Sequence, residues 1–217
     1  KIKKMSGYAW AKSIENEMRS FKNITIISNQ FIGQIAKHVG SGLPGEKIHY
    51  VLEETPEGVA NALNLARPHN ENCRLLVYFS DNITTIELAE HVERFTAQET
   101  DPGCLLLSRD EENPHAFGVA KFDTNGNIID IVEKPDDPPS NIAIGGIYLF
   151  DEQFWALVDE CYNEHGSNFS ITDVNRKYVQ QGQAELLNIG KETWIDCGTP
   201  DSLLSAALMA KAGKLDP

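Results

Sequence analysis

Apolar and polar positions along the first half of the chain follow two different periods. Short runs rich in β-branched residues, such as NITIIS at residues 23–28, have the pattern of buried strands. Between them lie segments with apolar residues three and four positions apart, which is typical of amphipathic helices. The pattern predicts helices at 9–19, 30–39, 56–66 and 84–97, and strands at 23–28, 47–52, 74–79 and 105–108. This alternation indicates parallel βαβ units.

The second half of the chain changes character and begins with a predicted β-hairpin at Phe117–Pro135. Asn125-Gly126 is expected to form the turn, because both residues tolerate positive φ angles. In the second strand of the hairpin, the period of two places Ile129, Ile131 and Glu133 on one face. A carboxylate would therefore lie beside two isoleucines of core type.

A long apolar strand and a second set of helices follow the hairpin. The strand at 141–150 is interrupted by Gly145-Gly146, and a glycine pair inside a strand is typical of a bulge or of a ligand lying close to the backbone. Helices are predicted at 152–161, 171–181 and 200–212, and strands at 185–189 and near Trp194. Two helix starts are also predicted: Thr84 or Thr85 with Glu87 in a capping box, and Thr199 as an N-cap.

Composition and charge narrow the class of protein. A chain of 217 residues with 41% hydrophobic content fits one α/β domain, or at most two small ones. The net charge of −13 argues against nucleic acid as a partner, which needs a basic surface. No apolar run approaches 18 residues, so no membrane span is expected. The four scattered cysteines predict reduced thiols in a cytoplasmic protein without a zinc site.

Two aspartates follow predicted strands at positions where ligands bind in open α/β sheets. Asp81 comes after the strand at 74–79, and Asp196 follows the short apolar stretch at Trp194. Each also fits an ordinary turn or N-cap aspartate, so position alone leaves both interpretations open. If the two side chains meet, they would suit one Mg²⁺, which takes one or two carboxylates together with phosphate oxygens.

Glu133 and Lys134 end the hairpin, and an acid beside an apolar stripe is costly to bury without a partner. The pair either rims a polar ligand site or is a solvated strand end. A further candidate is the strand-to-helix segment EETPEGVAN at 53–61, which contains Gly58. Backbone amides at such a helix start can hold an anion or a base edge. The segment has neither glycine-rich phosphate-loop pattern, GxGxxG or GxxxxGK[ST].

Six short motifs occur in a fixed order along the chain. They are Ser80-Asp81-Asn82-Ile83, Phe117-Gly118-Val119, Glu133-Lys134-Pro135, the strand 141–150, Ile171-Thr172-Asp173-Val174-Asn175 and Trp194 to Thr199. Together they resemble the sugar-1-phosphate nucleotidylyltransferases, and most closely the glucose-1-phosphate thymidylyltransferase branch. Each motif is weak alone, whereas six in order identify the family.

The resemblance implies a fold and a reaction. The expected fold is α/β, with a Rossmann-like mixed, mainly parallel sheet flanked by helices and a sugar-binding hairpin. Residues 1–217 would form one domain, with a nucleotide-binding half at 1–108 and a sugar-phosphate-binding half at 109–217. The implied reaction joins an NTP, dTTP or UTP by preference, and a sugar 1-phosphate to give an NDP-sugar and pyrophosphate.

The resemblance also implies roles for individual residues. Asp81 and Asp196 would bind Mg²⁺, and with Lys134, which would reach the sugar phosphate, they form the expected catalytic set. The other residues expected to contact substrate are Glu133 at the sugar hydroxyls, Gly118 and Gly146 beneath the sugar, Glu53 and Gly58 near the nucleobase, and Trp194.

Three departures from the family pattern stand out. The family opens with a strand and a Gly-x-Gly-Thr-Arg loop followed by Pro-Lys, and none of this is found here. Because that strand belongs at the centre of the sheet, we expect about 30 further residues upstream, the length of one βα unit. Glu53 replaces a base-contacting Gln of the family, and Gly166 stands where an Arg is expected.

Two other functions fit the same sequence. One is a non-catalytic relative that binds a sugar phosphate or an NDP-sugar as a regulatory or interaction subunit. The other is a nucleotidyltransferase that acts on a non-sugar acceptor such as phosphocholine. The sequence leaves the oligomeric state open, with a homo-oligomer among the options.

Overall fold

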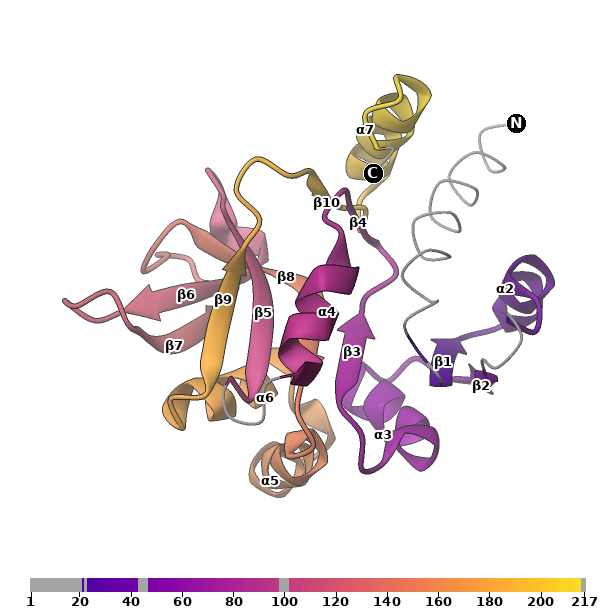
Figure 1. Cartoon of the computed structure of the whole chain (residues 1–217), viewed down its shortest axis with the longest axis horizontal. Coiled ribbons are helices and arrows are strands. Elements are labelled where there is room, and N and C mark those ends of the chain that lie inside the picture. Colours follow the sequence, from indigo (N-terminus) through magenta and orange to yellow (C-terminus); the bar gives the residue numbers. More distant parts are fainter. Residues whose placement is uncertain (1–20, 22, 43–46, 98–101, 216–217) are drawn as a thin grey trace.

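The computed structural model describes residues 21, 23–42, 47–97 and 102–215 (Figure 1). The helix predicted at 9–19 lies outside these residues. The strands are β1 (Asn23–Ser28), β2 (Lys47–Leu52), β3 (Leu75–Tyr78), β4 (Asn82–Thr84), β5 (Cys104–Asp110), β6 (Gly118–Phe122), β7 (Ile128–Glu133), β8 (Ile142–Phe150), β9 (Ala184–Asn188) and β10 (Trp194–Asp196). The α-helices are α2 (Ile32–Val39), α3 (Val59–Asn70), α4 (Leu88–Ala97), α5 (Phe154–His165), α6 (Ile171–Gln180) and α7 (Pro200–Lys211).

The main sheet is mixed, as predicted, but it is not mainly parallel. Its strands run in the order β7-β6-β8-β5-β9, and β3 also pairs with β8. Among the described strands, only β1–β2 and β5–β9 are parallel pairs, and the other five pairings are antiparallel. The prediction was wrong on this point because β8 runs opposite to both β3 and β5 and lies between them. Periodicity along a chain carries no information about strand direction.

The long strand β8 changes its neighbour along one edge. One edge pairs with β5 over nearly its whole length. On the other edge, Ala143 and Ile144 pair with β6, while Ile147 to Phe150 pair with β3. Gly145-Gly146 lies between these two partners. The end of β3 and the start of β6 therefore face each other across the glycine pair.

Helices cover both faces of this sheet. Successive side chains of each strand point to opposite faces. Cys104 and Leu106 of β5 pack with α5 and α6 in the larger core. Leu105 packs with α4 on the other face. Aromatic rings fill the larger core, with the Phe150 ring centroid 4.5 Å from that of Phe154 and 5.5 Å from that of Tyr178.

The hairpin β6–β7 differs from its prediction in two details. Only Gly126 of the predicted turn pair has a positive φ, at +85°. The loop is organised instead by Asp123, whose Oδ1 accepts from the backbone N–H groups of Asn125 and Asn127. The pairing register also shifts just before the turn. As a result Ile129 is 47% exposed, which corrects its predicted place beside the buried Ile131.

The predicted start of α4 was wrong. The helix begins at Leu88, and residues Asn82 to Thr84 form strand β4, which pairs with β10. The capping box of Thr84 or Thr85 with Glu87 is therefore not formed, and the Thr85 hydroxyl donates to Glu192 instead. The predicted N-cap of α7 is confirmed, since the Ser202 backbone N–H donates to Thr199 Oγ1.

Two further features complete the description of the fold. The parallel pair β1–β2 forms a sheet of its own beside α3, on the far side of β3 from β8 (Figure 1). None of the helices in the described ranges combines the length and apolar character needed to cross a membrane.

Candidate active site

Three of the predicted acids lie around one buried phenol. Tyr148, on β8, is 5% exposed, and burial is the main cause that raises the pKa of its hydroxyl. The negative charges of Glu133, Asp81 and Asp196 raise this pKa further, in that order. These carboxylates belong to the end of β7, the loop after β3 and the end of β10. The fold therefore brings together three acids that are far apart in the sequence.

Asp81 and Asp196 are held next to each other by the β4–β10 pairing. Asp196 lies opposite Asn82 in this register, and the Cys197 backbone N–H donates to the Asp81 carbonyl at 2.7 Å. The Gly198 N–H donates to Asp196 Oδ1 at 2.8 Å. The Asn82 amide donates to Asp81 Oδ1 at 2.8 Å. Each carboxylate thus has one oxygen bound by the protein.

The donor chemistry of this pair fits a hard divalent cation. Asp81 is exposed, Asp196 is half-buried, and each carboxylate has one oxygen outside these hydrogen bonds. Mg²⁺ prefers such oxygen ligands and takes its remaining ligands from water and phosphate. Among the described residues, no group of three or more His, Cys, Asp or Glu side chains is arranged to hold a metal ion without such added ligands.

Cys197, beside these acids, is not set up as a nucleophile. Burial is the largest cause that raises the pKa of its thiol, and the negative charges of Asp196 and Asp81 raise this pKa further. At neutral pH the group is a thiol, which is a poor nucleophile.

The Glu133–Lys134 pair closes the hairpin against α6. The Thr172 hydroxyl donates to Glu133 Oε2 at 2.5 Å, and Lys134 Nζ lies 3.7 Å from Glu133 Oε1. Lys134 has a φ of +43°, in the left-handed region that non-glycine residues rarely adopt. Its backbone N–H donates to the Phe117 carbonyl at 2.9 Å. Its ammonium group reaches solvent, because the side chain is 65% exposed.

Two glycines in the candidate site are closely surrounded. A Cβ at Gly118 would lie 3.3 Å from Ile131 Cγ2 and 3.4 Å from Thr172 Oγ1. A Cβ at Gly146 would lie only 2.6 Å from Asn82 Nδ2. Both positions therefore have a packing reason for glycine, whether or not a sugar lies over them.

Glu53 and Gly58 form a separate part of the candidate site, at the carboxyl end of β2. Glu53 is half-buried, and its Oε1 accepts from the Asn61 amide at 3.0 Å. Gly58 has a φ of +94° and precedes α3. In the described residues, the hydrogen bonds of Glu53 reach β1 and α3, not the acids around Tyr148.

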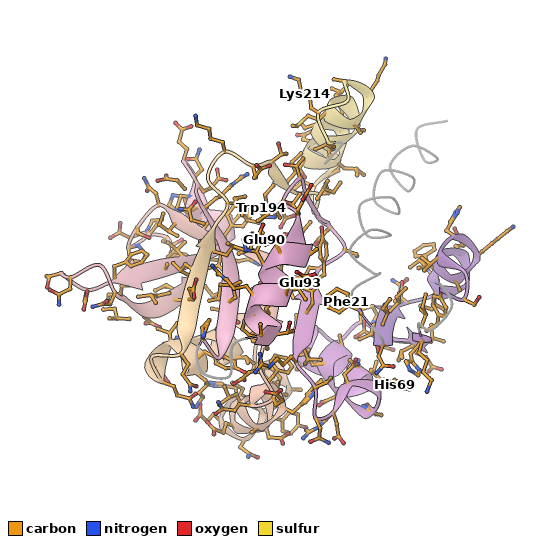
Figure 2. All side chains as sticks on the ribbon, in the orientation of Figure 1. Phe21, His69, Glu90, Glu93, Trp194 and Lys214 are labelled. Atoms are coloured by element: carbon orange, nitrogen blue, oxygen red, sulfur yellow. The ribbon has the colours of Figure 1, made fainter. Side chains whose placement is uncertain are left out.

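Trp194 lies beneath the candidate site rather than at its surface. Trp194, labelled in Figure 2, is 2% exposed. Its indole N–H donates to Asn82 Oδ1 at 2.7 Å. Its ring centroid lies 5.3 Å from that of Phe117, and the Arg109 guanidinium lies 4.6 Å from the Trp194 ring centroid. Contact between Trp194 and substrate stays a prediction, whereas its packing role is a feature of the fold.

Three residues in this region have no role assigned from the sequence. Asn82 and Thr172 hydrogen-bond the candidate acids, and the charges of these acids act on the buried Tyr148. Both polar residues belong to motifs noted above, Ser-Asp-Asn-Ile and Ile-Thr-Asp-Val-Asn. Motif membership was the only signal available, because their partners lie on distant strands.

A profile of the family described as nucleotidyl transferase matches residues 3–212 of the chain. The chain belongs to the nucleotidyl transferase family. It is 30% identical over 162 residues to the low-salt glycan biosynthesis nucleotidyltransferase of Haloferax volcanii, covering 75% of this chain and 45% of that protein. It is 32% identical over 165 residues to the glucose-1-phosphate thymidylyltransferase of Xanthomonas campestris, covering 75% of this chain and 55% of that protein. The chain thus spans about half the length of these curated relatives.

Solved structures agree with this membership. A Bacillus anthracis protein assigned as a glucose-1-phosphate thymidylyltransferase, in complex with a sucrose, superposes with a TM-score of 0.80 at 31% identity. That match covers 91% of this chain and 79% of the other. A UDP-glucose pyrophosphorylase has a TM-score of 0.73 at 16% identity, which shows likeness of fold alone. The resemblance found in the sequence to sugar-1-phosphate nucleotidylyltransferases is confirmed.

Proposed function

We propose that this nucleotidyl transferase is a Mg²⁺-dependent enzyme that joins an NTP, dTTP or UTP, to a sugar 1-phosphate. The observation that carries the proposal is the strand pairing, which brings Asp81 and Asp196 together beside Gly146 of β8 and brings Glu133 to the same part of β8 through Gly118. Two acids at strand ends supply cation ligands, and a third acid held by Thr172 supplies hydrogen-bond acceptors for hydroxyl groups. This combination suits a substrate that carries both a phosphate and a sugar.

In this proposal, the residues of the chain act by binding and orienting the two substrates. Glu133 accepts from sugar hydroxyls, while the exposed Lys134 ammonium pairs with the sugar phosphate. Asp81 and Asp196 hold Mg²⁺, which when bound neutralises phosphate charge. A sugar phosphate oxygen then attacks the α-phosphorus of the NTP in line, and pyrophosphate leaves. Positioning and charge stabilisation account for the catalysis, without a covalent intermediate.

The nucleotide side of the site belongs to the 1–108 half of a single domain, with Glu53 and Gly58 near the base. Within the described residues, β1 pairs only with β2, and β3 pairs only with β8. Each strand therefore has one edge without a sheet partner in the described part of the chain, and free edges are normally covered. A further strand that leads into a glycine-rich phosphate loop, placed between β1 and β3, satisfies both edges. The same loop supplies the positive charge that a triphosphate needs beside three acids.

The cytoplasmic location of the protein stays a prediction.

A pyrophosphate-release assay tests the proposed function. Four NTPs are each combined with several sugar 1-phosphates and with phosphocholine, in the presence and absence of Mg²⁺. Turnover with a sugar 1-phosphate and Mg²⁺ is the expected result. Turnover with phosphocholine alone would overturn the sugar assignment, and binding of an NDP-sugar without any turnover would favour the regulatory alternative.

The Asp81→Asn variant tests the proposed metal role within that assay. Its amide keeps the shape of the side chain but removes the charge, so turnover is expected to fall at least a hundredfold, the order of effect of lost electrostatic stabilisation. Asp201→Asn, a matched change on the exposed first turn of α7, serves as the control. Retained activity in Asp81→Asn would contradict its role as a metal ligand.

A further inference from the structure

One buried amide connects three elements beneath the candidate site. Asn82, on β4, is 2% exposed. Its Oδ1 accepts from the Gly146 backbone N–H at 3.0 Å and from Trp194 Nε1 at 2.7 Å. Its Nδ2 donates to Asp81 Oδ1 at 2.8 Å. The Asn82 side chain thus ties the loop after β3 to β8 and β10.

The chemistry of its partners allows only one orientation of this amide. A backbone N–H and an indole N–H are donors, so the amide oxygen must face Gly146 and Trp194. A flipped amide would set its NH₂ group against both donors. The amide nitrogen is therefore directed to Asp81, whose carboxylate only accepts. The resulting network keeps Asp81 Oδ1 turned inward and leaves Oδ2 outside this hydrogen bond.

The packing at Gly146 reinforces this arrangement. A Cβ at position 146 would lie 2.6 Å from Asn82 Nδ2 and 2.9 Å from its Cγ. Contacts this short force a shift, and the Asn82 amide is the group that would have to move. Glycine at position 146 therefore leaves the space that the Asn82 amide occupies.

We propose that Asn82 is a positioning residue, which holds the Asp81 carboxylate in its cation-binding orientation and fixes it relative to β8 and β10. This inference rests on the proposed function, in which Asp81 and Asp196 bind the metal. The β4–β10 pairing already places Asp196 opposite Asn82. Asn82 thereby sets the distance between the two metal acids and the glycine pair on β8. Loss of such a supporting hydrogen bond typically lowers metal affinity 10- to 100-fold.

Metal binding, read apart from turnover, tests this role. Mn²⁺ is titrated into the protein and followed by electron paramagnetic resonance for the wild type and for Asn82→Ala, Gly146→Ala and Asp81→Asn. Asn82→Ala is expected to bind Mn²⁺ about tenfold more weakly. Gly146→Ala, in which the new methyl displaces the amide, is expected to do the same without removing any polar group. It also serves as the second variant if Asn82→Ala does not fold.

Val92→Ala is the matched control, because it removes a buried side chain of α4 that takes no part in the Asn82 network. It is expected to lower the melting temperature and to bind Mn²⁺ like the wild type. Wild-type Mn²⁺ affinity in Asn82→Ala or Gly146→Ala would overturn the positioning role of Asn82 alone. An equal loss in Val92→Ala would also overturn it, by tracing the effect to stability. Wild-type affinity in Asp81→Asn would instead overturn the proposed metal site.

Discussion

At the scale of single residues, the orientation of Glu133 depends on one hydroxyl. Thr172 Oγ1 donates to Glu133 Oε2 at 2.5 Å. Thr172→Val keeps the shape and removes the donor. A hydrogen bond to a charged group is worth about 1.5–3 kcal/mol, so we expect KM for the sugar 1-phosphate to rise about tenfold with kcat changed less. Thr96→Val, which removes a hydroxyl that donates to Val92 O within α4, should leave KM unchanged. Unchanged KM in Thr172→Val would show that Glu133 does not hold the sugar.

A second residue of interest is Glu53, because the sequence resemblance implies a base-contacting Gln at its position. Its carboxylate only accepts, and Asn61 already donates to Oε1 at 3.0 Å. Gln at this position keeps an oxygen for Asn61 and adds N–H donors for the O4 atom of uracil or thymine. Glu53→Gln should therefore raise kcat/KM for UTP and dTTP relative to GTP about tenfold, the discrimination expected from one polar contact. Glu54→Gln is the neighbouring control. The same ratio in wild type and Glu53→Gln would place the base elsewhere.

At the scale of elements, β2 and α3 meet through a pair of histidines. The rings of His49 and His69 stack with centroids 4.1 Å apart. Burial is the largest cause that lowers the pKa of His49, and the positive charges of His69 and Lys47 lower this pKa further. The unfolded chain therefore takes up this proton at a higher pH than the folded one. The contribution of His49 to the free energy of unfolding is therefore fully present above the ordinary pKa of histidine. It is lost as the pH drops through that value.

Urea unfolding between about pH 7.5 and pH 5.5, the range that spans the ordinary histidine pKa, measures this effect. The wild type should lose stability as the pH falls, and His49→Gln should lose less. His38→Gln, on the exposed surface of α2, should keep the wild-type dependence. Equal slopes for the wild type and His49→Gln would show that the stack has no influence on the β2–α3 contact.

The elements also show how far local patterns can predict this fold. The strands at 23–28 and 47–52 were predicted with their observed bounds, because β-branched runs signal strands directly. The prediction of where α4 begins failed, because Asn82 to Thr84 pair with β10, which lies more than 100 residues later in the chain. Asp81, Asp196 and Glu133 could be chosen as candidates from the sequence, because each lies at or just after the end of a predicted strand. Thr172 and Asn82 could not be assigned, because their roles arise only from contacts between distant strands.

At the scale of the whole molecule, β1 of the small sheet and β3 of the main sheet each have an edge without a sheet partner in the described residues. Both edges belong to the half of the chain proposed to bind the nucleotide, and the three acids of the candidate site repel a triphosphate unless positive charge compensates them. One inserted strand with a glycine-rich, basic loop would pair both edges and balance this charge. We therefore predict that a strand with such a loop lies between β1 and β3 in the active protein.

Hydrogen exchange tests whether such a strand pairs with both edges in the active protein. Amides of β1 and β3 on the facing edges should exchange slowly if a strand lies between them, because paired edge amides open only with the sheet. Residues of α7, which lies apart from these edges in Figure 1, should exchange alike with or without the added strand. Rapid exchange along both edges would contradict the inserted strand. The triphosphate would then need its positive charge from another source, such as a partner chain.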